Sequence, residues 1–368
     1  MNKIISTIIV LVLTTFASAQ SFTIKAKYDE RVELMSILCH LAGYREYNMN
    51  MGGDYIIDID RYFSNVKNHP AVEMMVSLRN INGIGYDSPM FFAVYLDKKE
   101  GSFVLPSDDV VPERRWNGVD LKHAIETIND FYVKSDFATF IEQHKAFYQT
   151  ICDAYDSTII SKFNQNWYEQ FYGVPPTDNF EVVIGFTCGG GNYGPSRQLP
   201  NSPRNVYAIV GYALDDNGRP YFESEPKTFI NTLVHEFNHS FVNPLTADNS
   251  AQMEDTGKEL MRFSENVMRK NAYSNWQTII NESIVRAAVV LYNIDNGASS
   301  DSVRQLVIDE MATGFNWMPE LVKCMQSYSK NRDKYTTFGT YYPVITASLK
   351  SYVDELSEKV DAINSDKD

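Results

Sequence analysis

The segment Val234–His239 carries the residue types best suited to chemistry in this chain, because it has the spacing H-E-x-x-H. If the segment is helical, His235 and His239 lie one turn apart on one face, since residues i and i+4 are neighbours on a helix. Both imidazoles can then bind one Zn²⁺, and Glu236 projects beside the metal. A carboxylate there can act as general base on a zinc-bound water. The pattern therefore predicts His235 and His239 as zinc ligands and Glu236 as the catalytic base.

The flanking residues predict the helix that carries the motif. Ser224 is a capping residue type and Pro226 suits a first turn, whereas Pro244 should end the helix near Asn243. An apolar stripe at helical spacing lies opposite the histidines and consists of Ile230, Leu233, Val234, Phe237 and Phe241. We expect the helix to bury this stripe and to present its histidines to a cleft. The alternative, two solvated histidines, is disfavoured because the usual charged solvent-facing residues are missing.

A tetrahedral zinc needs one more protein ligand besides two histidines and a water. The extended motif H-E-x-x-H-x-x-G-x-x-H fails, because Val242 and Leu245 stand where it needs Gly and His. The other histidines all precede the motif; they are His40, His69, His123 and His144. A downstream carboxylate is therefore the better candidate. The acids within reach include Asp248, Glu254, Asp255, Glu259, Glu265 and Glu282.

Glu282 differs from the other acids in its surroundings. The run Thr278–Leu291 is apolar on nearly every side and predicts a buried helix, whereas most of the other acids lie in the polar stretch Asp248–Lys270. A carboxylate in a buried helix needs a partner, and Arg286 follows four residues later in the favourable order. Two interpretations stay open. Either Glu282 and Arg286 only pair with each other, or Glu282 is the third zinc ligand and Arg286 supports it or faces the substrate.

These motifs resemble those of the gluzincin metallopeptidases, which carry H-E-x-x-H on one helix and a Glu, often preceded by Asn, on a later helix. Asn281 and Glu282 match that pair, and Thr232 and Phe241 match the residue types that zincins prefer around the motif. The resemblance implies three zinc ligands and one general base, namely His235, His239, Glu282 and Glu236. One position departs from thermolysin-like enzymes, because Arg286 stands where they have Asp. The close surroundings of the thermolysin zinc therefore do not carry over.

The chain also resembles a family of secreted bacterial proteins catalogued as a domain of unknown function. The segments that carry this likeness are His235–Pro244, Asn281–Ala287 and Arg31–Tyr44. The likeness extends over most of the mature chain, and it implies nothing about the substrate.

The first nineteen residues have the pattern of a cleavable secretory signal. Lys3 supplies the positive charge, Ile4–Phe16 form an apolar run, and Ala17–Ala19 form an A-x-A cleavage site. The run is too short for a confident membrane span, and the absence of a Cys after the site argues against a lipid anchor. We expect a secreted or periplasmic protein without stable membrane insertion.

The net charge of −14 argues against nucleic acid as a partner. The spacing of the four cysteines favours no disulfide pairing.

After the signal peptide at 1–19, we expect a mostly helical N-terminal region at 20–155 and a zincin-like metallopeptidase domain at 156–368. The first region is interrupted by a short extended piece at Phe91–Leu96. Its helical segments are centred near Leu34–Leu41, Val72–Leu78, Leu121–Tyr132 and Phe137–Phe147.

A small sheet should directly precede the motif helix. Phe180–Thr187 and Val206–Leu214 are β-branched and aromatic runs, and Asp215–Gly218 is a hairpin turn signal. The Gly-rich segment Cys188–Pro195 between the runs fits an ordinary mobile turn better than the lip of a cleft. The expected fold is α+β and helix-rich, with the small sheet packed against the motif helix. The strand at Val206–Leu214 or its neighbour could bind a peptide by strand addition.

Together these features predict an exported zinc metallopeptidase that acts on a peptide or protein substrate. A donor for the oxyanion is also needed, and the candidates are Tyr335, Tyr341, Tyr342 and Arg286. Two other classes stay open: a zinc-containing surface binding protein without turnover, and a metal amidase that acts on non-protein or cell-wall amides. The oligomeric state stays unknown.

Overall fold

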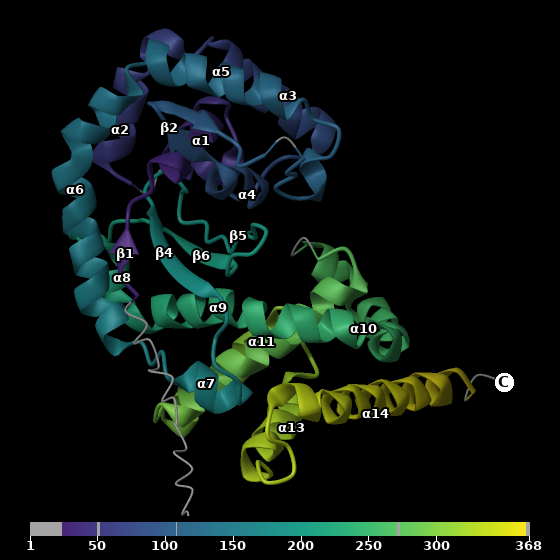
Figure 1. Cartoon of the computed structure of the whole chain (residues 1–368). Coiled ribbons are helices and arrows are strands. Elements are labelled where there is room, and N and C mark those ends of the chain that lie inside the picture. Colours follow the sequence, from purple (N-terminus) through teal and green to yellow (C-terminus); the bar gives the residue numbers. More distant parts are fainter. Residues whose placement is uncertain (1–23, 50–51, 108, 271–272, 366–368) are drawn as a thin grey trace, which may run out of the picture.

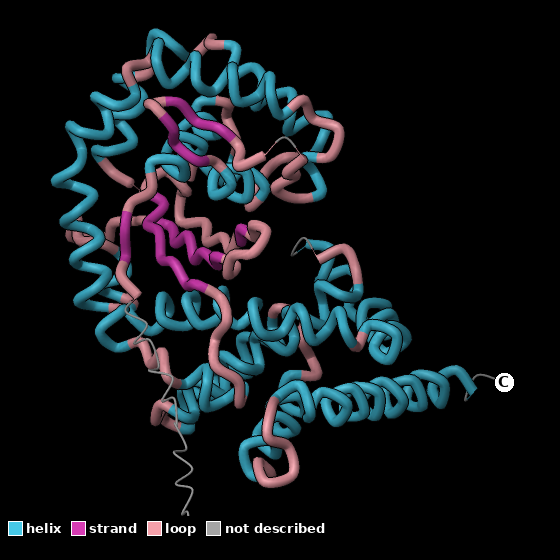
Figure 2. Tube along the Cα trace, in the orientation of Figure 1, coloured by secondary structure: helices cyan, strands magenta, loops and turns pink. Residues whose placement is uncertain are grey.

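The computed structural model describes residues 24–49, 52–107, 109–270 and 273–365. The expected signal peptide at 1–19 lies outside these described residues. The helix-rich α+β fold is confirmed: a small mixed sheet is surrounded by helices that make up most of the described chain (Figures 1 and 2).

The first half of the chain forms an arc of helices above and beside the sheet (Figure 1). Its helices are α1 (Glu30–Leu41), α2 (Asp54–Tyr62), α3 (Pro70–Asn82), α4 (Ser88–Tyr95), α5 (Leu121–Lys134) and α6 (Phe137–Thr158), and β2 (Asp97–Lys99) and β3 (Ser102–Val104) form a hairpin between them. The helix α6 runs without a break through the expected boundary at 155. The division into two regions stays a prediction.

The four-stranded sheet has the order β1–β4–β6–β5. The strands β1 (Ala26–Lys27), β4 (Asn179–Gly185) and β6 (Asn205–Gly211) are parallel, and β5 (Ser196–Arg197) is antiparallel to β6. The two runs that predicted strands therefore become β4 and β6. The pairing of β1 with β4 ties the N-terminal end of the described chain into the sheet.

The helices of the second half lie beside and below the sheet in Figure 1. They are α7 (Trp167–Tyr172), α8 (Tyr221–Ser224), α9 (Pro226–Asp248), α10 (Ser250–Lys270), α11 (Trp276–Asp295), α12 (Ser300–Ala312), α13 (Met318–Lys330) and α14 (Phe338–Ser365). The motif helix α9 lies between β6 and α11. Its apolar stripe faces the sheet, where Phe237 stacks on Phe180 with ring centroids 4.4 Å apart.

The expected end of the motif helix near Asn243 is wrong, because α9 continues through Pro244 to Asp248. Proline lacks an N–H and cannot bond to the carbonyl four residues earlier, which is that of Ser240. Arg204 replaces that bond, since its Nη2 donates to the Ser240 carbonyl over 3.1 Å. The contact satisfies the one acceptor that the proline leaves open. The helix also begins after Glu225 rather than at a Ser224 cap, because Ser224 ends α8.

The extended piece expected at Phe91–Leu96 is also wrong, because Phe91–Tyr95 belong to the helix α4. Its residues Met90, Phe92, Ala93 and Val94 are all completely buried. A helix that is buried all round gives an uninterrupted apolar run, which periodicity alone does not distinguish from a strand. The turn Asp215–Gly218 does form, but the chain then enters α8 instead of a long second strand.

All four cysteines are free thiols, and three of them are buried. Within the described ranges, no helix is long and apolar enough to cross a membrane.

Candidate metal centre

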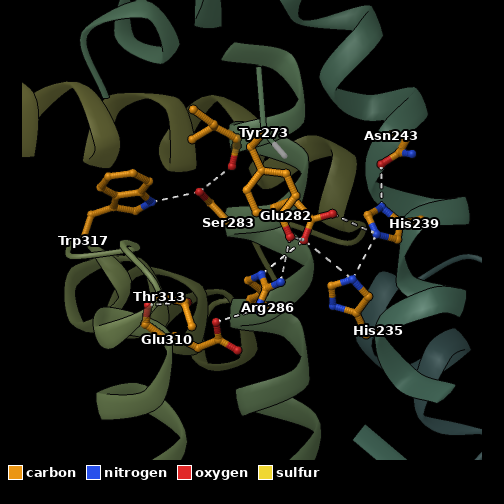
Figure 3. Close-up of polar contacts among 11 residues, drawn as sticks. His235, His239, Asn243, Tyr273, Glu282, Ser283, Arg286, Glu310, Thr313 and Trp317 are labelled. Carbon is orange, nitrogen blue, oxygen red and sulfur yellow. Dashed lines mark hydrogen bonds and ion pairs between the residues drawn. The ribbon is translucent and has the colours of Figure 1, made fainter. Parts of the chain in front are cut away.

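Two neighbouring helices bring three metal-ligating side chains to one point (Figure 3). His235 and His239 extend from α9, and Glu282 extends from α11, which packs against α9. The two Nε2 atoms are 3.2 Å apart. Glu282 Oε1 lies 3.4 Å from His239 Nε2, and Oε2 lies 3.6 Å from His235 Nε2. These residues form a group that could hold a metal ion.

The two imidazole nitrogens have the spacing of two ligands of one tetrahedral metal. Zinc binds imidazole nitrogen and carboxylate oxygen at about 2.0–2.1 Å, so ligand atoms at tetrahedral angles lie about 3.3–3.4 Å apart. The two Nε2 atoms are 3.2 Å apart, close to that value. Each imidazole faces a different oxygen of Glu282, at 3.4 Å for His239 and 3.6 Å for His235, and one ligand atom from each of the three residues lies within 4.8 Å of the others. Three protein ligands also leave one tetrahedral position open, as in catalytic rather than structural zinc sites.

A second set of contacts orients these candidate ligands. Asn243, one turn after His239, places its Oδ1 3.1 Å from His239 Nδ1. An amide oxygen can only accept, so Nδ1 carries the proton and Nε2 is left to bind a metal. Glu282 Oε2 accepts from Tyr273 Oη and from Arg286 Nε, each over 3.1 Å.

Arg286 bonds to other side chains besides Glu282. Its Nη1 donates to Glu310 Oε2 over 2.8 Å, and its Nη2 donates to Tyr273 Oη over 2.9 Å. The guanidinium also lies over the ring of Phe315. The two interpretations of Glu282 are therefore not exclusive, because the carboxylate pairs with Arg286 while it faces both histidines.

The close packing shifts the pKa values of the site. Burial lowers the pKa of His235, so this imidazole is neutral. Burial also opposes the charge on His239, but the Glu282 carboxylate outweighs burial and raises the pKa of that imidazole. In Glu282, the nearby histidines and Arg286 outweigh burial and hold the pKa below its ordinary value. The carboxylate is thus ionised, as a metal ligand must be.

Glu236 lies beside the group, under the Gly-rich segment. Burial raises the pKa of its carboxyl to about 7. Gly194 lies so close that a Cβ atom built on it would overlap Glu236 Oε2. The segment is therefore the lip of the site, contrary to the mobile turn that its composition favoured.

A hollow of about 380 Å³ opens beside the candidate metal group. His235, Glu236 and Arg286 form part of its lining, together with the polar side chains of Asn192 and Thr232. The site is thus accessible to a ligand from outside.

The other candidates do not join this group. On α10, Glu254, Glu259 and Glu265 pair with basic residues three or four positions later on the same helix. The hydroxyl of Tyr341 donates to the Cys324 carbonyl, and that of Tyr342 bonds to Thr246 Oγ1. Of the expected oxyanion donors, only Arg286 lines the hollow.

Sequence reasoning missed Asn243, Tyr273, Glu310 and Gly194. Asn243 carried a usable signal, because it follows His239 by four residues and so shares its helix face. Tyr273 and Gly194 lie in irregular segments, and Glu310 lies on a different helix, so spacing alone did not single them out.

Comparisons with curated proteins and with solved structures return no match. The model of a domain of unknown function, DUF4932, matches residues 114–348. This match contains the complete His–His–Glu group and covers more than half of the chain. The protein therefore belongs to the DUF4932 family.

Proposed function

We propose that this protein is a zinc-dependent metallopeptidase of gluzincin type. The observation that carries the proposal is the convergence of His235, His239 and Glu282, whose ligand atoms lie within 4.8 Å of one another, with the Glu236 carboxylate beside them. Two imidazoles and one carboxylate are a donor set that zinc peptidases use, and they leave one position open.

The side chains suit the steps of amide hydrolysis. Zinc, when bound, would polarise the scissile carbonyl and lower the pKa of a water molecule. Glu236 accepts the proton of the attacking water and later delivers it to the leaving amine nitrogen. Gly194 limits where the Glu236 carboxylate can lie, and Asn243 holds the imidazole of His239 in the orientation that ligation needs.

The lip of the site favours a peptide over other amides. Tyr193 exchanges both backbone hydrogen bonds with Ile209 of β6, each over 2.9 Å. In an antiparallel pair, the next residue then turns its N–H and C=O away from the partner strand. That residue is Gly194, and within the described residues its backbone groups have no hydrogen bond. A free edge beside Glu236 suits the addition of an extended peptide strand.

The proposal is tested with purified protein reconstituted with zinc. We expect about one zinc per chain by metal analysis, and chelator-sensitive cleavage of a mixed peptide library followed by mass spectrometry. Glu236→Gln should retain zinc and lose the cleavage. A protein that binds no zinc at pH near 7 contradicts the proposal, as does a zinc-loaded protein that cleaves cell-wall amides but no peptide.

We also propose export, on the signal-like pattern of residues 1–19. The intact mass of protein recovered from the periplasm or medium should equal that of a chain that begins at Gln20. Recovery of the full-length chain from the cytoplasm alone contradicts export.

A further inference from the structure

A second hollow, of about 260 Å³, adjoins the hollow at the metal ligands. The two share Thr228, Asn231 and Leu306 in their linings, so they form one groove between α9 and α12. Asn231 lies one helical turn before His235, which is about 6 Å along the axis. A substrate whose scissile bond lies at the metal group can therefore place the side chain of a nearby residue against Asn231.

The groove is polar, and apart from Glu236 its charged side chains balance one another. Beyond Glu236, the charges at the metal end are Arg286 and Glu310, which pair over 2.8 Å. The far end has one charge of each sign, on Lys227 and Asp309. Away from Glu236, the lining therefore favours neither an anion nor a cation, and a neutral ligand with hydrogen-bonding groups suits it best.

Asn231 and Asn293 give the groove a defined hydrogen-bond polarity. Asn293 Nδ2 donates to the Val289 carbonyl over 2.9 Å, and a carbonyl can only accept, so the orientation of this amide is determined. The same Nδ2 donates to Asn231 Oδ1 over 2.7 Å. The bond determines the orientation of the Asn231 amide in turn.

The remaining halves of the two amides are available to a ligand. Asn231 Nδ2 is a donor and Asn293 Oδ1 is an acceptor, and no hydrogen bond within the described part of the chain uses either atom. Both side chains line the second hollow and neither is fully buried. A donor beside an acceptor is complementary to the C=O and NH₂ of another carboxamide.

We infer that this groove is a specificity subsite that binds the carboxamide side chain of a Gln or Asn residue near the scissile bond. The inference rests on the proposed peptidase function and adds a substrate class to it. A site with paired polar groups rejects ligands that leave those groups unpaired, so an apolar or charged side chain of similar size should bind poorly.

The test uses peptides that differ at one position, scanned on both sides of the scissile bond and occupied by Gln, Glu, Met or Lys. The zinc-loaded parent should show kcat/KM at least about tenfold higher for Gln than for Met or Glu at one position. Equal rates for all four residues, or a preference for Met, overturn the inference and leave the peptidase proposal intact.

Asn231→Asp is the decisive variant, because it keeps Oδ1 for Asn293 and replaces the Nδ2 donor with an acceptor. The preference for Gln should disappear and that for Lys should increase. Asn205→Asp is the matched control, since Asn205 Oδ1 accepts from Asn179 Nδ2 in the same way over 2.9 Å but lies outside both hollows. It should keep the preference for Gln, and an equal loss in both variants contradicts the assignment.

A binding arm separates the inference from the peptidase proposal. Calorimetry on zinc-loaded Glu236→Gln should show tighter binding of the Gln peptide than of its Met and Glu counterparts. If no peptide is cleaved by the parent but this order of binding holds, the peptidase proposal fails and the subsite stands. Binding of N-acetylglucosamine oligomers without binding of the Gln peptide overturns the subsite.

Discussion

Gly194 lies directly against the carboxylate of Glu236, with no room between them for a Cβ atom. The two residues come from different elements, since Gly194 precedes β5 and Glu236 lies on α9. The contact places the free backbone edge of the Gly-rich segment beside the residue proposed as the general base.

Gly194→Ala should therefore displace the Glu236 carboxylate while leaving the metal ligands in place. We expect unchanged zinc content and a fall in kcat/KM of at least about tenfold, since misplaced catalytic groups lose rate steeply. The control is Gly339→Ala at the start of α14. The Cβ added there would lie 3.2 Å from its nearest neighbour, a methyl group of the flexible Leu245 side chain. Full activity in Gly194→Ala would show that this close approach has no role.

Glu236→Gln should retain zinc and folding and lose activity by at least about 100-fold, because an amide of nearly the same size does not act as a base. Metal analysis and steady-state kinetics on the same preparation measure the retained zinc and the lost activity. If the variant is as active as the parent, Glu236 is not the base.

Glu282→Gln should weaken zinc affinity markedly, because a neutral amide is a poor zinc ligand, and zinc should raise its Tm much less than that of the parent. Arg286→Met is the comparison. It removes the partner of Glu282 and Glu310 but keeps all three donor atoms, so it should cost stability more than zinc affinity. Unchanged affinity in Glu282→Gln would move the third ligand to another acid.

Asn243→Leu should lower zinc affinity by about 10- to 100-fold, since it removes the acceptor that orients His239 through Nδ1. Asn243→Asp restores an acceptor and should recover most of the affinity. Competition titrations with a zinc indicator measure both variants. Equal losses of zinc affinity in Asn243→Leu and Asn243→Asp would show that the Asn243 side chain does not orient His239.

Glu33 provides a test that is independent of the metal. Its buried carboxylate accepts hydrogen bonds from Tyr55 Oη and Thr187 Oγ1, and burial raises its pKa from 4.5 to about 7. Below pH 4.5 the group is protonated in both states. As pH rises from 4.5 through 7, the unfolded chain releases this proton first, so the folded state loses stability.

Relative to Glu33→Gln, the parent should lose up to roughly 3 kcal/mol of unfolding free energy between pH 4.5 and pH 8, from the shift in pKa. Urea unfolding of both proteins at pH 5 and pH 8 measures this difference. The same pH dependence in parent and variant would show that Glu33 is ionised in the folded state.

Several features of the site could be predicted because they are local in the chain. The i, i+4 spacing of His235 and His239 needs only a helix to bring two imidazoles together. The apolar surroundings of Glu282 marked it among the downstream acids, because a buried carboxylate needs a partner. The β-branched runs likewise predicted β4 and β6.

The remaining features depend on contacts between residues far apart in sequence. Pro244 signalled a helix end, and only the contact of Arg204 with the Ser240 carbonyl shows why α9 continues. The apolar run of α4 predicts an extended piece, because burial on all sides removes the periodicity that distinguishes a helix from a strand.

The sequence by itself determined the two histidines, the carboxylate between them and the helices that carry the ligands, because these follow from spacing and side-chain polarity along one element. Tertiary structure decided what surrounds them. The approach of Gly194 to Glu236 and the pairing of Asn231 with Asn293 join separate segments. Their geometry is set by how α9, α11 and the sheet pack, because short-range spacing within a chain carries no information about which distant segment will lie across a cleft.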